Sequence, residues 1–317
     1  MEIHDNRFHH RALSLIEVLV VISIIGIIVG LLLPAIQSVR GTADRMNCAN
    51  NMKQIALASH SYEAQHGAFP PMIAGFRIPG ITYRIQNLSW SVLLLPHIEQ
   101  DQAYLLALTL SLVAPMFENP PHTGLTQVIK TYVCPADARL YRPLTDDAGY
   151  TAAYTGYVGV MGGGVLAENG SFIRKPGIFE ARFNALRLED GTRMSDVTDG
   201  LSQTLHYGES PPYGKWFGSA WYTVEVPFEV LWMTRPDRTT NALFTPERHN
   251  NLCKGPFPFG PGQVDNPCDS HHYWSLHGSG ANFAFADGSV RFLSYSANSI
   301  LPALATRAGG EVVELPE

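Results

Sequence analysis

Histidine and aspartate occur near the C-terminus as His277 and Asp287, with Gly288 directly after the aspartate. An imidazole and a carboxylate could form a catalytic dyad or supply ligands to a metal ion. The context favours a structural role, because Asn282–Ala286 and Ser289–Leu293 flank the Asp-Gly pair as the strands of a hairpin would. A two-residue Asp-Gly connection is typical of a type I′ turn with positive φ at both residues. We therefore expect Asp287 to form the turn and His277 to hydrogen-bond a neighbouring loop.

Cysteine and histidine offer a second kind of chemistry. The residues concerned are Cys48, Cys134, Cys253, Cys268, His271 and His272. Cys253 and Cys268 together with the two histidines could hold zinc through thiolate and imidazole ligands. In an exported protein, a Cys253–Cys268 disulfide that closes a Gly/Pro-rich loop is simpler, and such closure stabilises by about 3 kcal/mol. Four cysteines permit three pairings, and the favoured one makes Cys48–Cys134 the second bridge.

No complete catalytic constellation is present in the sequence. Neither G-x-S-x-G nor H-E-x-x-H occurs, and the glycines at 162–164 lack the phosphate-binding pattern G-x-x-x-x-G-K-[ST]. The net charge of −6, with no run of Lys or Arg, argues against a nucleic-acid partner. We therefore predict a protein that is not an enzyme and that binds no nucleic acid.

The elements that would hold these residues begin with an apolar N-terminal segment. Val18–Val39 is an uncharged, mostly aliphatic run of 22 residues, which as a helix spans roughly 30 Å of hydrocarbon. The run is too long for the core of a secretory signal peptide, and a helix that is apolar all round has no soluble face. Glu17 stands at the edge of this run. A carboxylate at the full depth of a membrane costs about 2.5 kcal/mol or more, so Glu17 is expected to have a partner or a function.

The helical pattern continues to about Gln65 as an amphipathic segment, and His66-Gly67 predicts its end. From Pro70 onward, turn signals are frequent and the expected strands are short, including one at Thr131–Cys134. The sequence thus predicts an α+β protein with a long N-terminal helix and a β-rich body.

Residues Arg11–Glu17 resemble the prepilin cleavage motif of type IV pilins and type II secretion pseudopilins. The resemblance implies cleavage of the Ala12–Leu13 bond by a prepilin peptidase, with Ala12 in place of the usual glycine. It also implies N-methylation of Leu13 and a role for Glu17 in assembly. In a filament, the α-amino group of a neighbouring subunit's Leu13 could supply the cation that a buried Glu17 needs.

Two further positions carry the same resemblance. Gly26 and Pro34 stand where pilins commonly have a glycine and a proline, and Pro34 is expected to kink or melt the helix. In pilins, the first half of the long helix spans the membrane and its amphipathic half packs on the β-sheet of a globular head. Cys48 would lie on that second half and could tie it to the head.

A narrower resemblance covers nearly the whole chain. Several motifs occur together in the order typical of the DUF1559 family, large pilin-like proteins abundant in planctomycetes. They are Cys48–Ala58, Phe69–Pro71, Val133–Asp137, Asp199–Glu209 and His277-x9-Asp287-Gly288. Membership implies a type IV pilin-like architecture and defines no activity.

Calcium is the metal that the resemblance suggests, because major pseudopilins of type II secretion use calcium to order a loop of the head. Oxygen donors are available in two groups, Asp137 with Asp146 and Asp147, or Asp265 with Asp269. Neither group has the EF-hand spacing. We expect no cofactor, with calcium as the alternative, and assign no metal ligands.

The resemblance divides the chain into a leader (1–12), a transmembrane and assembly helix (13–65) and an exported β-rich head (66–317). It implies a structural subunit of a pilus or pseudopilus, whose partners are the prepilin peptidase/methyltransferase, like subunits in a filament and the inner membrane. The protein would cross the inner membrane once, with its head in a periplasmic or cell-surface filament. The alternatives are a membrane-anchored extracellular module that binds glycan or solute without polymerising and, less favoured, an anchored hydrolase.

Overall fold

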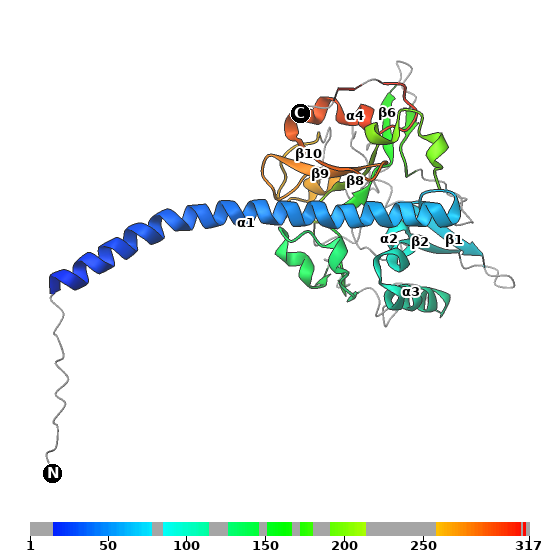
Figure 1. Ribbon diagram of the computed structural model, residues 1–317. Helices are drawn as coiled ribbons and strands as arrows, with labels where there is room; N and C mark the ends of the chain where they lie inside the picture. The colour runs from blue at the N-terminus through cyan, green and yellow to red at the C-terminus, as the bar shows by residue number, and fades with distance from the viewer. Residues whose placement is uncertain are drawn as a thin grey trace, which may run out of the picture. The chain divides into compact units, whose positions relative to one another are not determined.

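The computed structural model describes residues 15–77, 85–113, 126–145, 151–166, 172–179, 191–213, 258–311 and 313–314. The chain divides into two compact units, Met1–Ala43 and Asp44–Glu317, and the second is called the head unit below. The long helix α1 (Leu15–His66) contributes to both units (Figure 1).

The first part of α1 is apolar on every side. From Leu15 to Val39, every large aliphatic side chain is between 47% and 79% exposed. By length and composition, this helix can cross a membrane, as the uncharged run predicts. The sequence predicts a kink or a melted segment at Pro34; the helix is continuous through this proline, so melting is wrong and the kink stays a prediction. Proline removes one intrahelical hydrogen bond, and the turns on either side keep theirs.

The second part of α1 is built into the core of the head unit. Its buried side chains recur at helical spacing and define one stripe, which comprises Cys48, Met52, Ile55, Ala56, Ala58, Ser59 and Tyr62. The helix ends at His66, where Gly67 adopts a positive φ of 76° and its N–H donates to the Glu63 carbonyl at 2.7 Å. The amphipathic half of the predicted helix is therefore confirmed, with its end at the predicted residues.

The central sheet has four antiparallel strands in the order β10-β9-β8-β5. Their bounds are β5 (Tyr157–Gly159), β8 (Leu205–Glu209), β9 (Gly280–Phe285) and β10 (Val290–Ser294). In Figure 1, α1 crosses the strands of this sheet. Tyr157 and Tyr207 pack with the α1 stripe, whereas Val158 and Phe283 pack with the C-terminal segment. Because both faces are covered, β8 and β9 are buried along their whole length.

A register irregularity in β8 decides which side chains meet α1. The pairing of β8 with β9 shifts between Leu205 and Tyr207. Leu205 belongs to the cluster that contains the C-terminal helix, while Tyr207 belongs to the cluster that contains α1. Strict alternation would place both on one face, so the bulge turns Tyr207 toward the helix.

The β9–β10 hairpin is present, but its turn differs from the predicted one. Gly288 has a φ of 80°, whereas Asp287 does not have a positive φ. The Gly288 N–H donates to the Phe285 carbonyl, and the Phe285 N–H donates to the Ser289 carbonyl. This is a three-residue loop, a type I turn closed by a left-handed glycine, rather than a two-residue type I′ turn.

The remaining described elements are short and surround this core. The strands pair as β1 (Ile73–Arg77) with β2 (Ile85–Ser89), β3 (Leu144–Thr145) with β4 (Thr151–Ala152), and β6 (Gly162–Leu166) with β7 (Phe172–Pro176). The helices are α2 (Trp90–Leu93), η1 (Leu95–Ile98), α3 (Asp101–Val113), η3 (Lys130–Tyr132), η4 (Ala138–Tyr141), η5 (Met194–Asp196), η6 (Leu201–Gln203), η10 (Pro267–His271), η11 (Tyr295–Ser299) and α4 (Leu301–Leu304).

The strand expected at Thr131–Cys134 is absent, because η3 forms a turn of 3-10 helix there. Tyr132 is instead anchored by its own side chain, whose hydroxyl donates to the Ser91 carbonyl at 2.6 Å. The fold as a whole is α+β and pilin-like, with a long apolar N-terminal helix and a head of antiparallel sheets.

Candidate functional site

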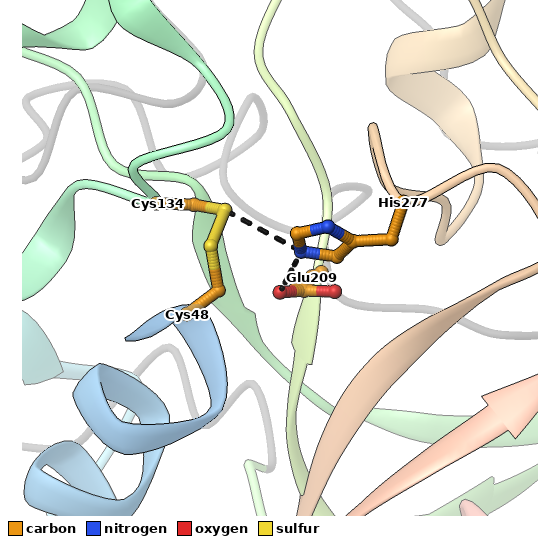
Figure 2. Close-up of side chains that lie close together, drawn as sticks. All are labelled: Cys48, Cys134, Glu209 and His277. Carbon is orange, nitrogen blue, oxygen red and sulfur yellow. Dashed lines mark hydrogen bonds and ion pairs between the residues drawn. A yellow bond between two sulfur atoms is a disulfide. The ribbon is translucent and has the colours of Figure 1, made fainter. Parts of the chain in front are cut away.

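A buried carboxylate and a buried imidazole face one another in the head unit (Figure 2). Glu209 is the last residue of β8, and His277 lies in the loop before β9. His277 Nε2 is 3.3 Å from Glu209 Oε1, and the two side chains are 3% and 1% exposed. Removing a carboxylate from water costs several kcal/mol unless it is paired and hydrogen-bonded, so the pairing is a condition for burying Glu209.

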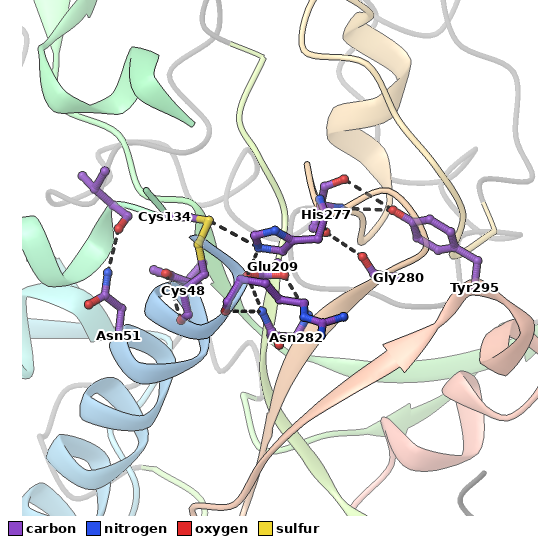
Figure 3. A network of polar contacts seen from close by, with 12 residues as sticks. Cys48, Asn51, Cys134, Glu209, His277, Gly280, Asn282 and Tyr295 are labelled. Carbon is purple, nitrogen blue, oxygen red and sulfur yellow. Dashed lines mark hydrogen bonds and ion pairs between the residues drawn. A yellow bond between two sulfur atoms is a disulfide. The ribbon is translucent and has the colours of Figure 1, made fainter. Parts of the chain in front are cut away.

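Asn282 on β9 fixes the orientation of this carboxylate (Figure 3). Its backbone N–H donates to Glu209 Oε2 at 2.7 Å, and its side-chain Nδ2 donates to Oε1 at 2.9 Å. The two strands are neighbours in the sheet, and this pairing brings the amide beside the carboxylate. Both carboxylate oxygens are therefore held by hydrogen bonds from one residue.

A small polar scaffold holds the loop that carries His277. Ser275 Oγ accepts from the His277 N–H at 3.0 Å and donates to the Gly280 carbonyl at 2.6 Å. The Ser275 N–H donates to the Tyr295 hydroxyl at 3.3 Å. The loop is thus tied both to the start of β9 and to the segment after β10, which fixes the position of the imidazole.

The negative charge of Glu209 contributes to a raised pKa at two neighbouring tyrosines. Burial raises the pKa of the Tyr157 hydroxyl well above its usual value, and the Glu209 charge raises this pKa further. The pKa of Tyr295 is raised by the same two causes, burial first. Both hydroxyls stay protonated at neutral pH and act as hydrogen-bond donors, as Tyr157 does toward the Cys48 carbonyl at 3.1 Å.

A disulfide between Cys48 and Cys134 completes the cluster. It links α1 to the segment after η3, with the two Cα atoms 4.8 Å apart. This confirms the predicted second bridge. Cys134 Sγ lies 3.7 Å from His277 Nε2, so sulfur, imidazole and carboxylate are mutual neighbours. Close by, Asn51 Nδ2 donates to the Val133 carbonyl at 2.8 Å and holds the same two segments together.

The other predicted cysteine site is described in part. Cys268 is disulfide-bonded, while Cys253 lies outside the described residues, so their pairing stays a prediction. His272 Nε2 contacts Asp269 Oδ1 at 3.1 Å. The side chain of His271 lies outside the described part as well. In this oxidised form the sulfur of Cys268 is not a thiolate and offers no ligand to zinc.

His277 and Asp287 do not form a pair with one another in the structure. His277 contacts Glu209, while the Asp287 carboxylate accepts from the Ser289 N–H at 2.8 Å within the hairpin turn. Asp287 therefore has a local turn-forming contact, and Gly288 supplies the positive φ that the turn requires.

Of the five aspartates considered for calcium, two are engaged by other groups, one is exposed and two lie outside the described residues. Asp137 forms a two-pronged pair with Arg139, with contacts at 2.8 and 2.6 Å. Asp269 contacts His272 and accepts from the Gln263 N–H at 2.7 Å, and Asp265 is exposed. Positions 146 and 147 are outside the described part of the chain. Among described residues, the one cluster of three or more close metal-ligating side chains is Cys48, Cys134, Glu209 and His277.

The predicted processing residues Ala12 and Leu13 precede the described residues. Glu17 lies in the first turn of α1, where a negative charge is favourable because of the helix dipole. Gly26 lies in the apolar part of the helix, and a side chain added there would meet no other atom within 4 Å.

Sequence reasoning assigned no role to Glu209 and Asn282. The segment Leu205–Glu209 has the sequence Leu-His-Tyr-Gly-Glu, so no apolar run marked its carboxylate as buried. The partner could not be identified from spacing, because His277 comes from a distant part of the chain.

Comparisons with known families agree with this architecture. Residues 7–33 match the prokaryotic N-terminal methylation motif, which makes the chain a prepilin-like precursor. Residues 37–299 match the model of the family described as a protein of unknown function (DUF1559). That match spans most of the chain, and the protein belongs to this family. No curated protein and no solved structure matches the chain.

Proposed function

We propose that this protein is a structural subunit of a type IV pilin-like or pseudopilin-like assembly. The observation that carries the proposal is the double character of α1. Its first part is apolar all round, and its second part lies in the core of the head unit. A helix that only anchors a domain has no need to continue into the domain's core, whereas an assembly subunit must couple its helix to its head.

The exposed apolar surface of α1 supports association between like subunits. Its aliphatic side chains pack against lipid before assembly and against other helices after it, so van der Waals fit decides between the two states. Gly26 and Gly30 both have open space where a side chain would begin. Small residues at such positions allow two helix backbones to approach closely.

Processing would complete this surface. Cleavage of the Ala12–Leu13 bond removes the leader (1–12) and creates a new α-amino group at Leu13, which the methyltransferase then methylates. In an assembly, this cation would lie near Glu17 of a neighbouring subunit. Their attraction is stronger away from water, which favours a defined stagger between subunits.

The proposed location follows from the same features. The candidate membrane anchor supports insertion of the unassembled subunit into the inner membrane, with the head on the exported side. The Cys48–Cys134 disulfide supports this placement, because disulfides persist in oxidising compartments and are rare in the cytosol. The prepilin peptidase/methyltransferase and like subunits are the proposed partners.

Intact-mass analysis of protein extracted from membranes tests the processing step. We expect a mature chain that begins at Leu13 and carries one methyl group. A chain that still begins at Met1 would refute processing, and an unmethylated chain that begins at Leu13 would refute only the methylation.

Replacement of Glu17 by alanine tests the assembly step. We expect Glu17→Ala to insert into the membrane at the normal level and to be lost from sheared filament fractions and from electron micrographs of cell surfaces. Ser23→Ala is the matched control, because the Ser23 hydroxyl bonds only within the helix, to the Leu19 carbonyl at 2.8 Å. Equal assembly of both variants would contradict the proposal.

A cavity of about 380 Å³ favours a second candidate function, a membrane-anchored module that binds a glycan or solute. Its lining includes Tyr62, His66, His97, Asp101 and Tyr104, and its volume lies in the range of small-molecule sites. This function predicts that Glu17→Ala leaves retention of the detergent-solubilised protein on immobilised glycans unchanged, while Tyr104→Ala reduces it.

A further inference from the structure

We propose that the reduced head binds a thiophilic divalent cation of the Zn²⁺ class through Cys48, Cys134, Glu209 and His277. One ligand atom from each of these residues lies within 4.8 Å of the other three. The disulfide occupies this centre in the oxidised protein, and the metal would occupy it in the dithiol form. The inference is independent of the proposed filament role, since it concerns only the head unit.

The geometry of the centre fits tetrahedral zinc. Zinc binds nitrogen and oxygen at about 2.0–2.1 Å and thiolate sulfur at about 2.3 Å, so tetrahedral edges are about 3.4 Å for N–O and about 3.6 Å for S–N. His277 Nε2 lies 3.3 Å from Glu209 Oε1 and 3.7 Å from Cys134 Sγ. Both edges already have the required length. The remaining ligand pairs lie within 4.8 Å of one another, and rotation of the two cysteine side chains after reduction would separate the sulfurs to about 3.8 Å.

The charges of the donor set also favour a dication. Two thiolates and the Glu209 carboxylate carry three negative charges, and His277 ligates as a neutral imidazole through Nε2. Glu209 is 1% exposed and both cysteines are buried. Such a concentration of negative charge away from water is stable only with a compensating cation, so the thiols lose their protons when the metal enters.

The surroundings hold the ligands as in preorganised metal sites. Asn282 donates to both oxygens of Glu209 and leaves lone pairs of Oε1 available to a metal. Ser275 fixes the backbone of His277. Such outer contacts typically contribute tenfold or more to metal affinity.

Thiol–disulfide exchange together with metal binding interconverts the disulfide form and the metal-bound form of this centre. An external dithiol reduces the Cys48–Cys134 bond by thiol–disulfide exchange and becomes a disulfide itself, leaving two protein thiols. The divalent ion then displaces both thiol protons to solvent. In the reverse direction, a disulfide-class oxidant takes two electrons from the thiolates and two protons from solvent and becomes a dithiol, while the protein disulfide re-forms and the metal is released. Metal and disulfide are therefore mutually exclusive at this centre.

The test uses the full chain in mild detergent, in a background where Cys253→Ser and Cys268→Ser leave only two thiols. After reduction with a phosphine and removal of the reagent, the protein is titrated with Co²⁺ and then with Zn²⁺. We expect one ion per chain, the absorption bands of tetrahedral cobalt–thiolate and their loss when zinc displaces cobalt. The unreduced protein should bind neither ion.

Two variants assign the remaining ligands. Glu209→Gln and His277→Ala should each weaken cobalt binding at least tenfold. The matched controls His97→Ala and Glu99→Gln replace an imidazole and a carboxylate elsewhere in the head unit and should bind as the background protein does. Unchanged binding in Glu209→Gln and His277→Ala would overturn the proposal, as would binding of equal strength in the oxidised protein.

X-ray absorption at the zinc edge keeps the proposal testable if those variants fail to fold. The reduced, zinc-loaded background protein should show two sulfur ligands near 2.3 Å and two nitrogen or oxygen ligands at about 2.0–2.1 Å. Fewer than two sulfur ligands, or the absence of stoichiometric zinc, would refute the site.

Discussion

Replacement of both Cys48 and Cys134 by alanine removes the covalent link between α1 and the rest of the head unit. The bridge closes a loop across a sequence separation of 86 residues. Loop-closure entropy for this length corresponds to about 4.6 kcal/mol in the free energy of unfolding at 25 °C. This is a large share of the roughly 5–15 kcal/mol that stabilises a typical protein.

The noncovalent contacts at the same junction are weaker. The hydrogen bonds from Asn51 to the Val133 carbonyl and from Tyr157 to the Cys48 carbonyl remain in the variant. Each contributes about 0.5–1.5 kcal/mol net, so together they do not replace the bridge.

Urea unfolding of the detergent-solubilised chain measures the effect. Trp90 is a suitable fluorescence reporter, because it is 6% exposed and its ring centroid lies 5.8 Å from that of Tyr132. At a slope of about 3 kcal/mol per molar urea, the midpoint should fall by about 1.5 M.

Single replacements separate the link from the side chains. Cys48→Ala and Cys134→Ala each break the same bridge and should be destabilised about as much as the double variant. A loss below about 1 kcal/mol in the double variant would refute the assignment of this stability to the bridge. Zinc should restore part of the stability of the reduced background protein but none in the double variant, because a ligand stabilises only the state that binds it.

Three further outcomes follow from the head unit. Burial, followed by the nearby His60, lowers the pKa of His206 well below its ordinary 6.5. Below pH 6.5, the imidazole is therefore protonated in the unfolded chain but not in the folded chain. The free energy of unfolding should fall by about 1.4 kcal/mol for each unit by which the pH is lowered in this range. In urea titrations, His206→Phe should lose this dependence on pH. Ser59→Ala leaves the buried Tyr207 hydroxyl without its 2.5 Å partner and should cost about 1–3 kcal/mol, whereas Ser59→Thr should cost less. Gly288→Ala forces a side chain onto a φ of 80° and to 3.2 Å from the His60 ring, so thermal denaturation should show a loss of about 1–2 kcal/mol.

The long helix was predictable because its determinants are local. The aliphatic run Val18–Val39, the amphipathic continuation and the His66-Gly67 end are all legible within a few turns of the residues concerned. The β9–β10 hairpin was predictable for the same reason. Its turn type was not, because the choice between two-residue and three-residue loops depends on the register of the paired strands.

The buried centre in the head could not be predicted from spacing. β8 pairs with β9 across a long stretch of sequence, and that pairing alone brings Asn282 to Glu209. The sequence motif suggested Asp287 as a partner of His277, but the Asp287 carboxylate accepts a hydrogen bond within its own turn. No local pattern encodes which distant carboxylate an imidazole will meet.

The sequence by itself thus determined the type of element and the membrane-competent segment, since these depend on local periodicity and hydrophobicity. It favoured the Cys48–Cys134 pairing among the three that four cysteines permit, and the tertiary structure decided it. Only the tertiary structure decided that the disulfide lies against His277 and Glu209. The physical reason is that burying a carboxylate requires partners from several elements at once, and those elements meet only when the sheet closes on α1.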